Sequence, residues 1–179
     1  IERLASLGHE IVTIDIEPFL AAGSLMYDGP WVAERLTGLE GFIDGHPGSL
    51  FPVVGEVLAA ARGRSAVDAF RGVHRLAELV ARTTPQWAVI DAFVLPTVPS
   101  SPMISDALTD PHGVNASLGR YTTFCNLLDL AAIAVPSELS AGGLPVGVTF
   151  YGPSGSDALL AGIGAGFHAA PGLATGATA

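Results

Sequence analysis

Short apolar runs typical of β-strands alternate with helical segments along this chain, and this alternation is the strongest constraint on its fold. The strand-like runs cover residues 10–16, 89–95, 131–135 and 144–151. The helical segments cover residues 19–25, 30–39, 53–61, 65–82, 118–128 and 156–168. Because the strand-like runs carry few polar residues, both faces of the sheet that they form must be buried against other elements. The pattern therefore predicts an α/β fold with helices on both faces of the sheet.

Residues 65–82 form the clearest amphipathic helix in the sequence. Ser65 and Asp68 have the spacing of a capping box, with Asp in place of the usual Glu. Apolar residues then recur at helical spacing, at Val67, Phe70, Val73, Ala77 and Val80. Such a stripe is typical of a helix that packs one face against the rest of the protein.

The composition limits the partners that the chain can bind. Its 179 residues are enough for one domain, and its formal net charge is −9. Nucleic-acid binding requires clustered Lys and Arg, so we expect no nucleic-acid partner. No apolar run approaches the ~20 residues needed to cross a bilayer, so we expect no membrane partner.

Cysteine and histidine usage is similarly restrictive. Cys125 is the single cysteine, which excludes an internal disulfide and favours a reducing compartment. The five histidines lack the spacing of metal ligands, so we expect no metal and no cofactor. Three glycines at 162, 164 and 166 partly match a dinucleotide fingerprint. They lie inside an expected helix, which favours close helix packing instead. With no visible targeting segment, we expect a cytoplasmic protein.

A resemblance to a known family narrows these expectations. Residues 115–150 read NASLGRYTTFCNLLDLAAIAVPSELSAGGLPVGVTF, and Val94-Leu95-Pro96-Thr97 lies upstream. Together they closely resemble the C-terminal half of an amidase-signature hydrolase, and the branch that they look like is allophanate hydrolase. The resemblance implies part of an amidase-signature fold, in which a mixed β-sheet is covered by helices on both faces.

A second block, residues 25–35, contains the candidate substrate-binding residues. It is similar to the substrate-recognition segment of allophanate hydrolases, in which a Tyr and an Arg eight residues apart bind the carboxylate of the substrate. The matching residues are Tyr27 and Arg35. Allophanate is a urea that bears a carboxylate, and a guanidinium fork with a nearby phenol suits such an anion. The alternative is structural, with Tyr27 at the rim of the core and Arg35 paired with Glu34 or Glu40.

Other polar residues of the matched stretches have two interpretations each. Thr97 is a candidate cleft-lining residue, and capping of its loop is the alternative. Asn126 and Asp129 are expected to satisfy backbone groups near a helix end rather than to act in catalysis. Arg120 is expected on the surface.

The catalytic residues of the family have no counterpart in this sequence. The resemblance implies a Ser–Ser–Lys triad, in which one Ser attacks the amide carbonyl to form an acyl-enzyme. The sequence contains no lysine and no matching Gly/Ser-rich motif. Arginine cannot replace the lysine, because it does not lose its proton near neutral pH. We therefore expect no catalytic residue in this chain and place the triad upstream of it.

The missing triad predicts that the chain is a piece of an amidase domain. Residues 1–168 are expected to form the C-terminal portion of that domain, and residues 169–179 a tail or linker. The expected partners are the upstream half of the same domain and a small carboxylated urea. A homodimer is left open.

Three functions remain under consideration. The first is an allophanate hydrolase that releases ammonia and carbon dioxide during urea or s-triazine degradation. The second is another amidase-signature amidohydrolase, acting on a general amide or an amidated tRNA precursor. The anion-binding pair Tyr27 and Arg35 argues against a neutral amide. The third is a non-catalytic module that binds a small carboxylate or a protein, which would require these residues to fold cooperatively by themselves.

Overall fold

A small antiparallel sheet lies at the centre of the described part of the chain. The computed structural model describes residues 1–46 and 48–170. In these residues the sheet has three strands in the order β1-β3-β2, with β1 at Phe93–Pro96, β2 at Leu130–Leu139 and β3 at Pro145–Pro153. Phe93 pairs with Tyr151 between β1 and β3, and Ile133 pairs with Phe150 between β2 and β3.

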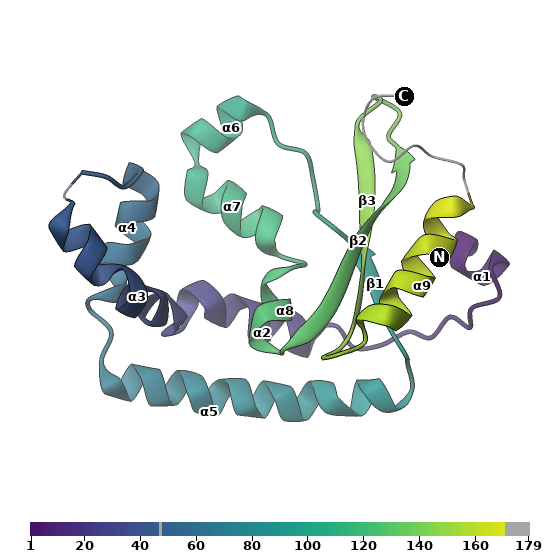
Figure 1. Ribbon diagram of the computed structural model, residues 1–179, viewed down its shortest axis with the longest axis horizontal. Coiled ribbons are helices and arrows are strands. Elements are labelled where there is room, and N and C mark those ends of the chain that lie inside the picture. Colours follow the sequence, from purple (N-terminus) through teal and green to yellow (C-terminus); the bar gives the residue numbers. More distant parts are fainter. Residues whose placement is uncertain (47, 171–179) are drawn as a thin grey trace.

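Helices surround this sheet, and three of them connect β1 to β2 (Figure 1). Before β1 the chain forms α1 (Glu2–Ser6), α2 (Glu17–Asp28), α3 (Trp31–Gly45), α4 (Pro52–Ala61), α5 (Ala66–Thr83) and the short 3-10 helix η1 (Thr84–Ala88). Between β1 and β2 lie α6 (Ile104–Thr109), α7 (Pro111–Gly119) and α8 (Thr123–Leu127), and α9 (Asp157–Ala169) follows β3. No helix in the described residues is both long and apolar enough to cross a membrane.

One face of the sheet packs against α2, α5 and α8 through a cluster of aromatic rings. Phe19 from α2 contacts Phe93 of β1 and Phe124 of α8, with ring centroids 5.0 and 6.0 Å apart. Tyr151 of β3 completes the cluster, 5.0 Å from Phe93 and 5.0 Å from Phe124. Leu79 of α5 is fully buried in the same cluster. This aromatic cluster holds residues from five elements together, namely α2, α5, β1, α8 and β3.

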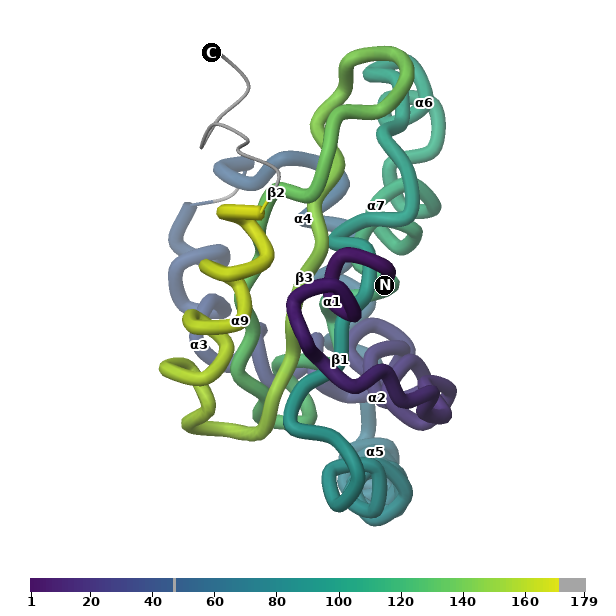
Figure 2. The backbone as a smooth tube through the Cα atoms, turned by 90° about the vertical axis from the view of Figure 1, so that its right-hand side faces the viewer, coloured from purple at the N-terminus to yellow at the C-terminus, as the bar shows by residue number. Residues whose placement is uncertain are grey.

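The opposite face of the sheet packs against α9 and α1. Phe150 points to this face because it neighbours Tyr151 in β3, and successive strand residues alternate between faces. It packs with Leu4 of α1 and with Leu160 and Phe167 of α9. In Figure 2, α9 lies on one side of the strands and α2 and α5 lie on the other. Both faces of the sheet are therefore covered, which confirms the predicted α/β class.

The strand pairings differ in one respect from the mixed sheet that the resemblance implies. β3 pairs antiparallel with both β1 and β2. A parallel pair would need strands outside the described residues. The boundary of the strand predicted over 89–95 also shifts, because this run begins in a turn directly after η1 and enters the sheet only at Phe93.

The strand predicted over residues 10–16 is wrong. These residues form no regular secondary structure and pair with no strand in the described part of the chain. Ile14 and Ile16 pack against the aromatic cluster. Val12, which precedes them in the same segment, is exposed. The alternating pattern thus arises from packing onto the core and not from a strand in the sheet.

The single helix predicted over residues 118–128 is also wrong. α7 ends at Gly119, and α8 begins at Thr123. The turn between them is closed by hydrogen bonds from the Arg120 amide to the Ser117 carbonyl and from the Thr122 amide to the Gly119 carbonyl, at 3.1 and 3.0 Å. This break directs α7 away from α8 and shapes the site described below.

The helix predicted over 65–82 forms as α5, but its apolar stripe faces outward. Ser65 accepts a hydrogen bond from the Asp68 amide at 3.2 Å, and the Asp68 carboxylate accepts one from the Ser65 amide at 3.0 Å, which confirms the capping box. The buried face carries Gly72, Leu79 and Thr83. The predicted stripe, called here the outer stripe, comprises Val67, Phe70, Val73, Ala77 and Val80, and all of it is exposed.

Candidate substrate-binding site

An open cleft of about 840 Å³ lies between the α2–α3 junction and the segment that contains α7 and α8. Both Tyr27 and Arg35 line it. The polar and charged side chains of the lining are Ser24, Tyr27, Asp28, Arg35, Asn115, Ser117, Arg120, Thr122, Thr123 and Asn126. The cleft therefore brings together the two sequence blocks that carry the family resemblance.

The α2–α3 junction places Tyr27 and Arg35 side by side. α2 ends at Asp28 and α3 begins at Trp31, so the chain bends between the two residues. The Arg35 guanidinium carbon lies 5.3 Å from the centroid of the Tyr27 ring, a cation–π geometry. Gly29 makes the bend possible, because a Cβ there would collide with the Leu25 carbonyl oxygen and the Trp31 ring. Tyr27 remains 39% exposed, so the pair faces open space.

The structural alternative for Arg35 is not observed. Arg35 forms no ion pair within residues 1–46 and 48–170, so neither Glu34 nor Glu40 neutralises it there. Glu40 pairs instead with Arg62, at 2.7 Å. The Arg35 charge thus stays available to the cleft.

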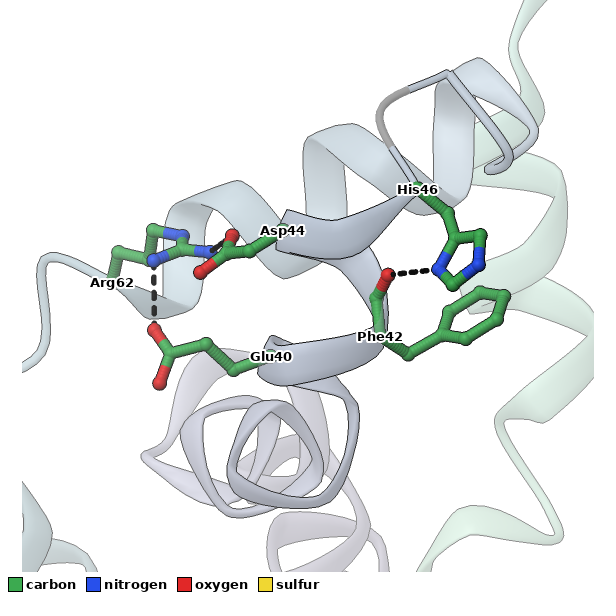
Figure 3. Close-up of polar contacts among 5 residues, drawn as sticks. All are labelled: Glu40, Phe42, Asp44, His46 and Arg62. Atoms are coloured by element: carbon green, nitrogen blue, oxygen red, sulfur yellow. Dashed lines mark hydrogen bonds and ion pairs between the residues drawn. The ribbon is translucent and has the colours of Figure 1, made fainter.

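The helix that carries Arg35 is supported from the far side by α4 (Figure 3). Arg62, directly after α4, bonds Glu40 at 2.7 Å and Asp44 at 2.8 Å, and both carboxylates come from α3. The ring nitrogen Nδ1 of His46 lies 2.9 Å from the Phe42 carbonyl oxygen at the end of α3. These contacts are exposed, so each contributes little free energy. Beneath them Val32, Leu36 and Leu58 form a buried apolar contact.

The opposite wall of the cleft contains residues whose role the sequence did not reveal. Arg120, predicted as a surface residue, is exposed but lines the cleft. Asn126, predicted to satisfy backbone groups, also lines it. Asn115 and Ser117 of α7 complete this wall. The signal that could have identified them is their place in the stretch of densest resemblance, residues 115–157.

The two walls meet where α2 crosses α8. A Cβ at Gly23 would lie 2.6 Å from Thr123 Oγ1 and 3.0 Å from the Phe124 amide nitrogen, so no larger residue fits without displacement. Phe124 next to this contact is fully buried in the aromatic cluster. The base of the cleft is therefore fixed by the core.

A buried phenol holds the far wall in place. The Tyr151 hydroxyl donates a hydrogen bond to the Tyr121 carbonyl oxygen at 2.6 Å, in the turn next to Arg120. Burial raises the pKa of Tyr151 to about 12, so the phenol keeps its proton and remains a donor at neutral pH.

Cys125, beside the cleft, is not arranged as a nucleophile. Its thiol donates to the Leu130 carbonyl oxygen at 3.2 Å. Burial raises the pKa of the Cys125 thiol, and the nearby charge of Asp129 raises it further. The reactive thiolate is therefore disfavoured at neutral pH. Asp129 itself lies in a turn with φ of 51°, a conformation that Asp tolerates better than most residues.

Thr97 lies away from this cleft, at the end of β1. Its hydroxyl is 2.9 Å from the Thr149 hydroxyl, and its amide donates to the Gly147 carbonyl oxygen at 3.1 Å. Thr97 is not part of the lining that contains Tyr27 and Arg35. Its place in a catalytic cleft of a larger domain stays a prediction.

The lining of the cleft suits a small anion. Arg35 and Arg120 are its cationic side chains and Asp28 its acidic one, so the lining carries a net charge of about +1 in a chain of −9. Tyr27, Asn115 and Asn126 add neutral hydrogen-bond donors. Among the residues that the structure describes, no group of three or more His, Cys, Asp and Glu side chains could hold a metal ion.

Comparisons with known proteins agree with this description. The model of the family described as Amidase matches residues 1–161. The chain is 37% identical over 162 residues to urea amidolyase of Lachancea kluyveri, a match that covers 89% of this chain and 9% of that protein. It is 28% identical over 176 residues to 2-amino-5-chloromuconic acid deaminase of Comamonas testosteroni, covering 94% of this chain and 37% of that protein.

The fold also agrees with a solved structure. Allophanate hydrolase of Kluyveromyces lactis superposes with a TM-score of 0.89 and 34% identity, over 93% of this chain and 28% of that one. The chain thus spans a small part of the length of the relatives that it matches. On the family match over residues 1–161 and this superposition, the chain belongs to the amidase family.

Proposed function

We propose that this chain is the substrate-binding portion of an allophanate hydrolase. The observation that carries the proposal is the pairing of Tyr27 and Arg35 in one open cleft, with the guanidinium 5.3 Å from the ring centroid. A guanidinium presents two parallel N–H donors to a carboxylate, and the phenol can add a third donor. Allophanate offers this carboxylate on a planar urea that is small enough for the cleft.

The proposed reaction is hydrolysis of a C–N bond in that substrate. The amidase resemblance supplies a serine that attacks the amide carbonyl, and the departing nitrogen takes a proton and leaves as ammonia. Water then releases the acyl group from the serine, and the products decompose to ammonia and carbon dioxide. The Ser–Ser–Lys triad of this step is proposed to lie in the upstream half of the domain, since the present sequence contains no lysine.

The role of Tyr27 and Arg35 in this reaction is orientation. A carboxylate fixed at one end of the molecule holds the scissile amide at a set distance from the nucleophile, which lowers the entropic part of the barrier. Arg35 lies on α3, a helix supported by α4 and by the buried contact of Val32, Leu36 and Leu58. This support fixes the backbone from which the Arg35 side chain extends into the cleft.

The domain limits and the cellular setting belong to the same proposal. Residues 1–168 are proposed to form the C-terminal portion of an amidase domain, and 169–179 a tail or linker, of which 171–179 lie outside the described residues. The single Cys125 and the amidase relationship support a role in cytoplasmic nitrogen metabolism, with urea or an s-triazine as the source of allophanate. A homodimer remains a further proposal.

Substitution of Arg35 in the full-length protein tests the function. Arg35→Lys keeps the charge but loses the two-point grip, so we expect kcat/KM for allophanate to fall by about 5- to 150-fold, or about 1–3 kcal/mol. Arg82→Lys is the matched control, because Arg82 is exposed and does not line the cleft. Biuret, in which a carboxamide replaces the carboxylate, should respond much less to Arg35→Lys. Unchanged kinetics on allophanate would contradict the proposal and favour an amidase for another substrate.

A further inference from the structure

The cleft contains a second guanidinium that the family resemblance did not assign. Arg120 lines the same cleft as Arg35 but approaches from the turn between α7 and α8, on the opposite wall. Its guanidinium carbon lies 5.9 Å from the centroid of the Tyr121 ring, next to it in sequence. The two arginines are 85 residues apart in the sequence, and folding brings them to one cavity.

Within the described residues, four of the six arginines outside the cleft have a structural partner, whereas Arg64, Arg82 and Arg120 have neither an ion pair nor a side-chain hydrogen bond. Arg62, Arg71 and Arg75 form ion pairs with carboxylates of their own region. Arg3 bonds the Ser137 carbonyl oxygen at 2.8 Å. Within residues 1–46 and 48–170, Arg120 forms neither an ion pair nor a side-chain hydrogen bond. An acidic chain thus leaves this cation facing the cleft.

The turn that carries Arg120 is fixed from below by the core. Tyr151 is 1% exposed, and its hydroxyl bonds the Tyr121 carbonyl oxygen at 2.6 Å. The Arg120 amide bonds the Ser117 carbonyl oxygen at 3.1 Å. The close contact of Gly23 with Thr123 fixes the spacing between this wall and α2. The backbone at Arg120 is therefore held in place, although the Arg120 side chain is exposed.

We infer that Arg120 is a specificity-determining residue that, together with Arg35, makes the cleft selective for a small anionic acyl urea over a neutral amide. This inference rests on the proposed function and adds a second cation to it. A carboxylate has about four acceptor sites on its two oxygens, more than one guanidinium fork fills, so a second cation across the cleft can bind the same anion. The field of two cations also raises the local concentration of the anion.

Tyr151 is a positioning residue in this scheme, because it acts through the Tyr121 carbonyl and does not line the cleft. Tyr151→Phe keeps the ring in the aromatic cluster and removes the donor. It should raise the KM for allophanate by less than Arg120→Gln does. It should also leave the salt dependence intact, since both arginines remain.

Kinetics of the full-length protein on allophanate test the inference. We expect Arg120→Gln to raise KM by about fivefold, with kcat changed less, since an exposed charge contributes modestly. The increase of KM with added NaCl should also become flatter, because one screened attraction is gone. Arg120→Lys should recover most of both effects. Arg82→Gln is the control, and the melting temperature of each variant shows that it folds.

The outcomes separate this inference from the proposed function. If Arg35→Gln weakens allophanate but Arg120→Gln behaves like Arg82→Gln, the role of Arg120 is overturned and the proposed function stands. A raised KM with an unchanged salt dependence also overturns it, because Arg120 would then act as a structural support. If neither cleft arginine affects allophanate, both proposals fail.

Discussion

The aromatic cluster and the outer stripe of α5 are both groups of apolar side chains, but they have opposite surroundings. In the cluster, Phe19 is fully buried and contacts rings from β1, α8 and η1. On the outer stripe, Phe70 is 66% exposed, and Figure 1 shows α5 along the lower edge of the molecule. The two regions show that apolar periodicity identifies a surface that can be buried without saying what buries it.

The difference has a physical cause in how α5 docks. Its inner face places Gly72 against Pro30 and Trp31 at the start of α3, and Leu79 in the aromatic cluster. Glycine allows the backbone of α5 to approach closely, so a face poor in large side chains is the one that packs. The larger side chains of the outer stripe then point away from the core.

The largest expected effect comes from truncating the two phenylalanines. Phe19→Ala removes a fully buried ring and should lower the free energy of unfolding by about 3–5 kcal/mol. Phe70→Ala removes a mostly exposed ring and should cost less than about 0.5 kcal/mol. Urea denaturation of the protein that contains this chain measures both. Equal losses would break the comparison and show that another surface covers the outer stripe.

A smaller effect is expected on the inner face of α5. At Gly72 a Cβ would overlap the Pro30 ring and lie 3.2 Å from Trp31 Cζ3. Gly72→Ala should therefore cost up to about 2 kcal/mol, the overpacking penalty less the gain in helix propensity.

Gly38→Ala is the matched control for this substitution. Gly38 lies inside α3, and a Cβ there would meet no atom within 4 Å. It should stabilise the protein by up to about 1 kcal/mol through helix propensity. Thermal unfolding should show a lower melting temperature for Gly72→Ala and a higher one for Gly38→Ala. A higher melting temperature for Gly72→Ala would contradict the close docking of α5.

The smallest effect is expected at the N-terminus of α5. Ser65→Ala removes the cap and should cost about 1 kcal/mol at pH 7. Hydrogen bonds from the Ser65 amide, and then from its hydroxyl, hold the pKa of Asp68 below its ordinary value. An Asp whose pKa is lower in the folded than in the unfolded state stabilises the folded protein when the pH is above the unfolded-state pKa. This stabilisation is lost as the pH falls through the folded-state pKa.

The pH dependence sharpens this last prediction. The gap in melting temperature between Ser65→Ala and the parent should narrow as the pH falls below about 4. Ser101→Ala, in the loop after β1, is the control and should show no gap at either pH. A gap that stays constant with pH would mean that the Asp68 carboxylate takes no part in the cap.

Much of the local structure could be predicted from the sequence, because local rules decide it. The capping box of Ser65 and Asp68, the bend between Tyr27 and Arg35, and the final helix before residue 170 follow from propensities and spacing. At Ser156, however, the hydroxyl donates to the Pro153 carbonyl oxygen at 2.6 Å and makes no cap. The helix begins where the sequence predicts it, and no side-chain hydrogen bond caps its start.

The errors share a common origin in contacts between distant residues. Residues 10–16 have the alternation of a strand, but Ile14 and Ile16 pack on the core without a pairing partner. The outer stripe has the spacing of a core face, yet Gly72 and Leu79 are the residues that dock. A periodic pattern describes which side chains share a face, and it carries no information on which surface arrives to cover that face.

The sequence by itself determined the α/β class, the amidase resemblance, the absence of a lysine for the catalytic triad, and the pair Tyr27 and Arg35. Each of these depends on residue identity or short spacing. The tertiary structure alone decided that Arg120 and Asn126 join that pair in one cleft. This happens because the break between α7 and α8, the Tyr151 hydrogen bond and the Gly23 contact set the position of the far wall. Such long-range contacts leave no periodic trace in the chain.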